Sequence, residues 1–298
     1  MENILERLPE GSRVAVIRLR SLGDCVLSTP ALHILRRARP DLRVAVAVET
    51  RFAAIFEGNP DVDSLLRPSV AAVRAWRPEL CLNLHGGTRS ALMTALSGAR
   101  YRAGFGHYRF PRLYNVRIPR AQEILGVERT VHTAEHAASA LFYLGAPRVE
   151  IPRARLFARG ERSRAPYAVI HALASQPDKV WPKEKFLEVA AALPFEPVFI
   201  GGAGENLTPF LKYRTVSGAP LSETLRLLEG ASLFIGNDSG PAHVAAAFGV
   251  PLVVIFGSSN PAIWAPWRAS AEVLTDLDRV GVDRVLSAVS RLQVHAGD

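Results

Sequence analysis

The feature that most constrains the fold is a repeated alternation of short apolar segments with segments of helical periodicity. In the first half, the apolar segments that predict strands lie at residues 14–19, 42–48, 62–66, 80–84 and 101–104. The helical segments lie at residues 24–39, 52–57, 90–97 and 132–144. Strands that alternate with helices in this way predict a parallel sheet covered by helices on both faces.

The alternation stops between Gly145 and Pro166 and then begins again. This segment contains three prolines and has weak periodicity, so it is interpreted as a domain linker with an entering edge segment. The strands expected after it lie at residues 167–171, 197–201, 233–235 and 252–256, and the helices at 183–193, 221–228, 240–248 and 280–292. We therefore expect an α/β protein with two Rossmann-like domains, residues 1–150 and 151–298, whose parallel sheets face each other across a cleft.

Charge and cysteine content narrow the class of protein further. The formal net charge is +8 and the isoelectric point is near 10, which favours phosphates, acidic glycans, anionic lipid surfaces or nucleic acid as partners, although a bias toward arginine accounts for much of the excess. Cys25 and Cys81 have neither zinc-site nor disulfide-framework spacing, which fits a reducing cytoplasm. No apolar run is long enough to span a membrane, and residues 1–13 do not read as a signal peptide. We expect a cytoplasmic protein that touches a membrane only at its surface.

The turn after the first predicted strand holds a candidate catalytic carboxylate. The segment runs from Arg18 to Asp24 and includes Gly23, which permits a close backbone approach. Asp24 follows the carboxyl end of a strand, where ligands of α/β proteins bind. From the sequence, Asp24 is either a helix cap or a general base.

Three loops of the second half carry candidate phosphate-binding residues. The first, residues 171–182, contains His171, Ser175 and Lys179, and its Trp181 is expected to be a buried plug. The second, residues 201–205, is glycine-rich and ends in Glu205, which is either a ribose acceptor or a cap.

The third loop joins a strand to a short helix and contains Asp238, Ser239, Gly240, Pro241 and His243. Asp238 and Ser239 occupy N-cap positions, and Pro241 occupies the first turn. The exposed amides and the positive dipole end of such a helix can bind an anion. The alternative is a well-capped helix with no ligand.

Arginines and aromatic residues alternate between Arg100 and Arg120, with no acidic residue between them. Arg102 and Arg109 belong to this run, which suits nucleic acid, an acidic sugar-lipid or a solvated loop. Asp61 and Asp63 match the DxD pattern of metal-dependent sugar transfer, but turn and cap roles are favoured because they precede a strand. No metal site is expected.

Several long stretches together resemble one family. The segments "IRLRSLGDCVLSTPALHILRRARPDLRVAVAV" and "FIGNDSGPAHVAAAFGVPLVVIFGSSNPAIWAPW" are similar to the two signatures of the ADP-heptose:lipopolysaccharide heptosyltransferases. "HALASQPDKVWPKEKF" and "LNLHGGTRSALMTALSGARYRAGFG" match the landmarks between these signatures. The resemblance covers nearly the whole chain in the same order.

The resemblance implies a GT-B fold and an inverting, metal-independent transfer of heptose from an ADP-sugar, with no cofactor. It implies that Asp24 is the general base and that Arg18, Arg20, Arg102 and Arg109 contact the acceptor. The implied donor-binding residues are His171, Ser175, Lys179, Glu205, Asp238, Ser239, Gly240, Pro241 and His243. The implied acceptor is an acidic glycolipid at the inner face of the inner membrane, and nucleic acid is not an expected partner.

Two other functions stay open at this point. One is a nucleotide-sugar epimerase on the same two-domain fold, which would turn over a UDP-sugar without an acceptor. The other is a noncatalytic protein that binds acidic glycolipid or nucleic acid, in which Asp24 would have no chemical role. The identity of the acceptor, the linkage and the oligomeric state do not follow from the sequence.

Overall fold

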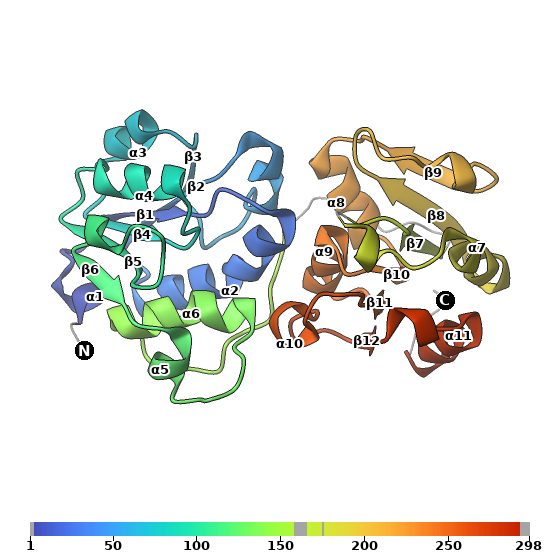
Figure 1. Ribbon diagram of the computed structural model, residues 1–298. Coiled ribbons are helices and arrows are strands. Elements are labelled where there is room, and N and C mark those ends of the chain that lie inside the picture. Colours follow the sequence, from blue (N-terminus) through green and yellow to red (C-terminus); the bar gives the residue numbers. More distant parts are fainter. Residues whose placement is uncertain (1–2, 158–165, 175, 293–298) are drawn as a thin grey trace. The chain divides into compact units, whose positions relative to one another are not determined.

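The chain forms two compact units, Met1–Phe157 and Ala158–Asp298, here called unit 1 and unit 2. The structure is a computed structural model, and it describes residues 3–157, 166–174 and 176–292. Each unit is an α/β layer structure around its own sheet (Figure 1). The predicted alternation of strands and helices is therefore present in both units.

Unit 1 contains a sheet of six parallel strands in the order β3-β2-β1-β4-β5-β6. The strands are β1 (Arg13–Ile17), β2 (Arg43–Ala47), β3 (Ser64–Leu66), β4 (Leu80–Asn83), β5 (Tyr101–Phe105) and β6 (Val116–Ile118). The central strands are buried because their residues are small or branched and apolar, as in Val14, Val16 and Val46.

Helices cover both faces of this sheet. They are α1 (Ile4–Arg7), α2 (Leu22–Ala38), α3 (Val70–Trp76), α4 (Thr88–Ala95), α5 (Ala121–Leu125) and α6 (Thr133–Leu144). α2 packs against α6 on one face, and α3 packs against α4 on the other (Figure 1). α6 ends at Gly145, whose φ of 113° is unfavourable for a residue with a Cβ, and the helix predicted over residues 132–144 therefore stops at this glycine.

Unit 2 repeats the same topology, with the strand order β12-β11-β10-β7-β8-β9 and all pairs parallel. The strands are β7 (Tyr167–His171), β8 (Glu196–Gly201), β9 (Arg214–Ser217), β10 (Leu233–Asn237), β11 (Leu252–Ile255) and β12 (Ala271–Leu274). Counted within each unit, both sheets have the strand order 3-2-1-4-5-6, which defines the Rossmann fold.

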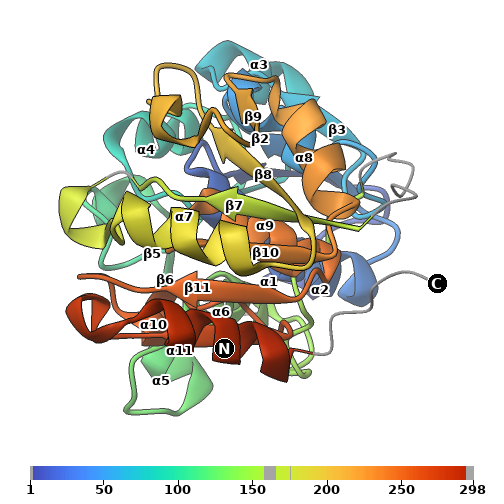
Figure 2. The ribbon, with the colours of Figure 1, turned by 90° about the vertical axis from the view of Figure 1, so that its right-hand side faces the viewer.

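The helices of unit 2 are α7 (Lys183–Ala192), α8 (Leu221–Glu229), α9 (Gly240–Phe248), α10 (Pro261–Trp264) and α11 (Val282–Arg291). α7 and α11 lie side by side on one face of the sheet, as Figure 2 shows, and α8 packs against α9. The buried residues between the sheet and the α7–α11 pair, which include Trp181, Phe186 and Phe199, form the main core of this unit.

Unit 1 extends to residue 157, beyond the predicted boundary after residue 150. Ile151, Ala154 and Leu156 are buried, and the Arg155 amide donates to Thr29 Oγ1 on α2 at 3.2 Å. Residues 151–157 therefore pack on unit 1 because their apolar side chains and backbone find partners there. The rest of the predicted linker, residues 158–165, lies outside the described residues.

Candidate functional site

In unit 2, the strand order switches between the neighbouring parallel strands β7 and β10, because successive strands are added on opposite sides of this pair. The connection after β7 leads toward β8, whereas the connection after β10 leads toward β11, so the two loops separate at the carboxyl ends. A crevice at such a switch point is the usual ligand site of doubly wound sheets. His171 is the last residue of β7 and Asn237 is the last residue of β10, so three predicted donor-binding loops begin or meet here.

His171 joins two of these loops. Its Nδ1 lies 3.0 Å from Ser239 Oγ, and its Nε2 lies 3.8 Å from Glu205 Oε2. The carboxylate of Glu205 also accepts a hydrogen bond of 2.6 Å from the Gly202 amide. The contact with His171 is the main reason why the pKa of Glu205 is lowered, so this carboxylate is anionic at neutral pH.

Ser239 is the N-cap residue of α9, but its side chain does not cap the helix. Its Oγ is bonded to His171 instead, and Pro241 in the first turn has no amide hydrogen. α9 therefore begins without a side-chain cap. An uncapped helix N-terminus with its positive dipole end favours an anion such as phosphate.

A lysine and a carboxylate meet beside this helix end. Lys179 Nζ lies 3.6 Å from Asp238 Oδ2, and Ser259 Oγ donates to the same oxygen at 2.6 Å. The loop that carries Lys179 packs directly against Gly257, where a Cβ would lie only 2.2 Å from the Asp178 carbonyl oxygen. A glycine at position 257 is therefore required to bring this loop close to β11.

Two buried residues fix the loop in place. The Trp181 amide donates to Asn237 Oδ1 at 3.0 Å, and the Trp181 indole donates to the Val280 carbonyl at 3.0 Å. Trp181 is fully buried, so its predicted role as a plug is confirmed. Of the remaining predicted donor residues, His243 is buried on α9, and Ser175 lies outside the described residues.

The switch point of unit 1 lies between β1 and β4, and Asp24 is placed beside it in the first turn of α2. Asp24 Oδ1 accepts from Arg18 Nη1 at 3.1 Å, and Oδ2 accepts from Ser21 Oγ at 2.8 Å and from the Ser21 amide at 3.4 Å. The carboxylate thus stabilises the start of the helix. Its side chain is still 23% exposed, so it can also meet a ligand.

A buried asparagine of β4, which is not among the residues predicted from the sequence, completes this end of unit 1. Asn83, the last residue of β4, is fully buried, and its Oδ1 accepts from the amides of His85 and Gly86. Asn237 ends the equivalent fourth strand of unit 2. Each asparagine therefore holds a loop at the carboxyl edge of its sheet, the loop after β4 in unit 1 and the loop after β7 in unit 2. The shared position within two equivalent strands is the sequence signal that could have revealed them.

Three histidines, His85, His107 and His136, follow or face the strands at this end of the sheet, and the last two contact aromatic rings. Phe105, the last residue of β5, stacks on His136 with a centroid distance of 4.0 Å and contacts His107 at 5.4 Å. Burial lowers the pKa of all three histidines, to about 4 for His136, and the positive charge of Arg18 lowers it further for His85 and His136. These imidazoles are therefore neutral at pH 7, and Arg18 is a permanent cation near His85 and His136.

The four predicted acceptor arginines lie in three different segments of unit 1. Arg18 is buried against Asp24, whereas Arg20 is exposed in the adjoining turn. Arg109 is exposed in the loop after β5 and lies over the Phe110 ring. Arg102 lies away from the carboxyl end of β5, because its side chain donates to the Ala99 carbonyl before the strand.

The carboxylates of the DxD sequence, Asp61 and Asp63, are engaged in contacts with other residues of unit 1. Asp61 Oδ2 lies 3.1 Å from His33 Nδ1, and Asp63 Oδ2 accepts from Arg36 Nη2 and from the Val44 amide. Both side chains therefore hold the segment before β3 in place. Across residues 3–157, 166–174 and 176–292, no group of three or more His, Cys, Asp or Glu side chains is arranged to hold a metal ion.

Solved structures with the same architecture identify the fold class. A glycosyl transferase family 9 protein from Veillonella parvula DSM 2008 has a TM-score of 0.84 at 22% identity, with 95% of this chain and 97% of that chain covered. The E. coli heptosyltransferase WaaC with ADP has a TM-score of 0.75 at 19% identity, with 93% and 99% covered. The predicted GT-B fold, with two Rossmann-like units, is confirmed.

Sequence comparison gives the family. The model for glycosyltransferase family 9 (heptosyltransferase) matches residues 70–281, and the chain belongs to this family. Lipopolysaccharide heptosyltransferase 3 of Escherichia coli (strain K12) is 25% identical over 290 residues, with 84% of this chain and 83% of that protein covered. The protein is therefore a glycosyltransferase, and the predicted family and enzyme class are confirmed.

Proposed function

We propose that this enzyme transfers heptose from ADP-heptose to a lipopolysaccharide core or a related glycan, with inversion at the anomeric carbon and without a metal ion. The observation that carries the proposal is the switch point of unit 2, where His171, Lys179 and the uncapped start of α9 converge in a member of the heptosyltransferase family. The ADP in the related WaaC structure supports adenine diphosphate as the nucleotide.

In the proposed reaction, Asp24 accepts the proton of the acceptor hydroxyl. The hydroxyl oxygen forms a bond to the anomeric carbon as the bond from that carbon to the diphosphate oxygen breaks, and ADP leaves with the electron pair. A general base typically contributes about 10²–10⁴ in rate. Asp24 precedes the matched residues 70–281, so its role rests on its place after β1 and on its partly exposed carboxylate.

Stabilisation of the leaving diphosphate is assigned to unit 2. Lys179 supplies a point charge, and the first-turn amides of α9 supply hydrogen-bond donors and a positive dipole end. Glu205 is proposed to hold the ribose of the nucleotide. His243 and the Asp238 side chain are proposed to contact the transferred sugar. Metal independence is supported by the structural roles of Asp61 and Asp63, whose carboxylates are engaged with His33 and Arg36.

The acceptor is proposed to be an acidic glycolipid at the inner face of the inner membrane, reached by peripheral association of a cytoplasmic enzyme. The helices within residues 3–157, 166–174 and 176–292 are too short or too polar to cross a bilayer. Arg18, Arg20, Arg102 and Arg109 stay the proposed acceptor contacts, although Arg102 lies at the other end of its strand.

The proposal is tested by incubating the purified enzyme with ADP-heptose and a lipopolysaccharide that lacks heptose. The expected product gains the mass of one heptose residue and forms in the presence of excess chelator. Calorimetry should show tighter binding of ADP than of UDP. Turnover of a UDP-sugar without acceptor, together with tighter UDP binding, would replace the proposal with an epimerase.

A further inference from the structure

The outer side of α4 combines exposed leucines with arginines. Leu92 and Leu96 are one helical turn apart and are 48% and 52% exposed, while Ala91, Met93 and Thr94 on the other side of the helix are buried. Within residues 3–157, 166–174 and 176–292, only Val149 and Leu211 join them as exposed large hydrophobic side chains. Two of these four side chains therefore lie on α4 and its C-cap residue, Leu96.

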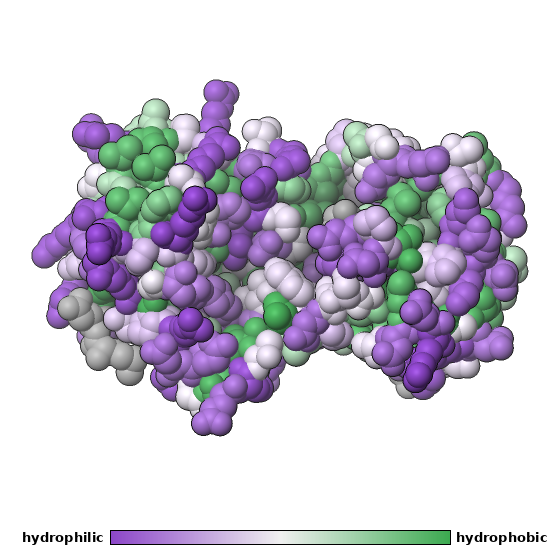
Figure 3. All heavy atoms as spheres, in the orientation of Figure 1, coloured by the Kyte–Doolittle hydropathy of each residue, from purple (hydrophilic) through white to green (hydrophobic). Residues whose placement is uncertain are grey.

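Three exposed arginines lie on α4 or on elements that pack against it. Arg89 lies one turn before Leu92, Arg74 lies on α3, and Arg112 lies in the 3-10 turn Pro111–Leu113, and both α3 and this turn pack against α4. We call the surface made by these five residues the α4 face. Figure 3 shows hydrophobic atoms over α3 and α4 with hydrophilic atoms beside them.

The charge of the chain is concentrated around this face. Residues 64–120 contain ten arginines and a single carboxylate, Glu79, although the formal charge of the whole chain is only +8. Glu79 Oε1 lies 3.9 Å from Arg100 Nη1, so the one carboxylate is itself near an arginine. The positive field of the protein therefore centres on the part of unit 1 that contains α3, α4 and β5.

We propose that the α4 face docks on an anionic lipid bilayer, with Leu92 and Leu96 entering the headgroup region and Arg74, Arg89 and Arg112 contacting lipid phosphates. Exposed aliphatic side chains framed by arginines have the chemistry of an interfacial membrane contact. Single-stranded nucleic acid is less suited, because bases stack on aromatic rings and the apolar residues of this face are leucines. A second copy is disfavoured because two arginine-rich faces repel.

This inference gives a surface to the membrane association proposed above, but vesicle binding is measured without donor or acceptor. A failure of docking therefore leaves the transfer reaction untouched, and a failure of transfer leaves the docking measurable. The probe is a sucrose-loaded vesicle of phosphatidylcholine, with or without phosphatidylglycerol, and the readout is the fraction of protein that sediments.

The wild type should bind the vesicles that contain phosphatidylglycerol, and this binding should weaken as salt rises. The double variant Leu92→Ser/Leu96→Ser should lose binding by about tenfold or more, because its apolar contact is removed. Val149→Ser/Leu211→Ser is the matched control, since it removes equally exposed apolar side chains elsewhere, and it should bind as the wild type does.

The charges are tested in the same way. Arg74→Gln/Arg112→Gln should weaken binding by about tenfold, whereas Arg226→Gln/Arg284→Gln, which removes two exposed arginines of unit 2, should change it little. Circular dichroism and the thermal midpoint confirm that each variant is folded. The proposal would be overturned if all variants bind equally or if the wild type binds only neutral vesicles. It would also be overturned if the protein retains a single-stranded RNA but not the vesicles.

Discussion

Lys179→Met is expected to weaken ADP binding strongly while the fold is kept. Lys179 Nζ lies 3.6 Å from Asp238 Oδ2, and its side chain is 21% exposed. At about 4 Å and an effective dielectric constant of about 20, the gross attraction between two unit charges is about 4 kcal/mol. Asp238 already balances this lysine in the free protein, so the net contribution to diphosphate binding is smaller, about 1.5–3 kcal/mol, or roughly 10–150-fold in Kd.

Two further variants separate this contribution from a general change of charge. Lys183→Met makes the same substitution at a 58% exposed position at the start of α7, and should change the Kd for ADP by less than about twofold. Asp238→Asn removes the carboxylate that competes with phosphate, so ADP affinity should stay the same or rise. Adenosine, which lacks phosphate, should bind the wild type and Lys179→Met equally.

Isothermal titration calorimetry with ADP and adenosine provides the measurement. The reasoning is refuted if Lys179→Met and Lys183→Met have the same effect on ADP binding, or if Lys179→Met weakens adenosine as much as ADP. In the first case the diphosphate would not contact Lys179. In the second case the variant would have disturbed the loop as a whole.

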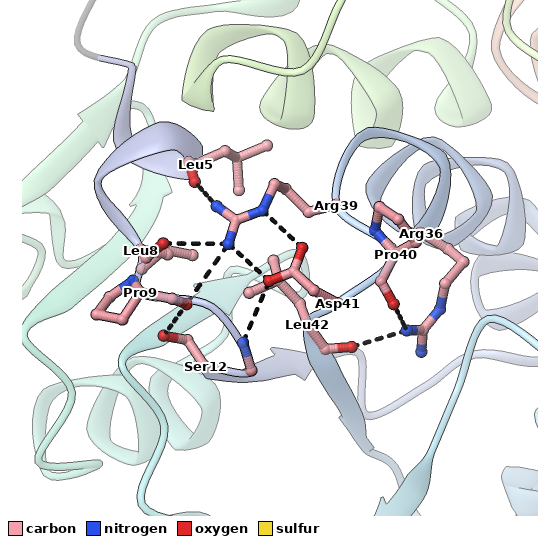
Figure 4. Close-up of polar contacts among 10 residues, drawn as sticks. Leu5, Leu8, Pro9, Ser12, Arg36, Arg39, Pro40, Asp41 and Leu42 are labelled. Carbon is pink, nitrogen blue, oxygen red and sulfur yellow. Dashed lines mark hydrogen bonds and ion pairs between the residues drawn. The ribbon is translucent and has the colours of Figure 1, made fainter.

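Three further predictions concern stability, thiol reactivity and metal. Arg39 donates hydrogen bonds to both carboxylate oxygens of Asp41 and to the backbone carbonyls of Leu5, Leu8 and Pro9 (Figure 4). Arg39→Leu should therefore lower the free energy of unfolding by about 2–3 kcal/mol. The control Arg37→Leu, at an exposed position, should lower it by less than about 0.5 kcal/mol. Since hydrogen bonds from Arg39 lower the pKa of Asp41 to about 2, this difference, measured by urea unfolding, should persist above pH 4 and shrink as the pH falls toward 2. Cys25 and Cys81, whose pKa values burial raises to about 12, should react with a thiol reagent at pH 8 only after unfolding, and fast reaction in the native protein would contradict their burial. Excess chelator should leave turnover unchanged, and loss of activity restored by magnesium or manganese would show that a divalent ion is needed.

Much of the fold could be predicted from the sequence because buried parallel strands are continuous apolar runs and α2, α6 and α9 have clear stops or starts. The short outer elements were missed. Neither β6 nor β12 is a continuous apolar run, because β6 contains the exposed Arg117 and β12 contains Glu272. α3 has seven residues, although its N-cap Ser69, which accepts from the Ala72 amide at 3.1 Å, was a usable signal.

The candidate site was predictable only where its residues follow a strand directly. His171, Asp238 and Asp24 were identified because a loop after a buried strand marks the carboxyl edge of a sheet. The contact of Phe105 with His136 could not be predicted, because it joins β5 to α6 and depends on how these elements pack. The direction of the Arg102 side chain was equally hidden, since it depends on a hydrogen bond to the Ala99 carbonyl.

The central claim is that Asp24 is the base of a transfer reaction whose nucleotide is bound by unit 2. The most direct measurement compares the turnover and the ADP affinity of Asp24→Asn with those of the wild type. The amide keeps the shape of the carboxylate but cannot take a proton, so kcat should fall by about 10²–10⁴ while the Kd for ADP stays within about twofold. Turnover close to that of the wild type, or a loss of ADP binding as large as the loss of turnover, would contradict the assignment.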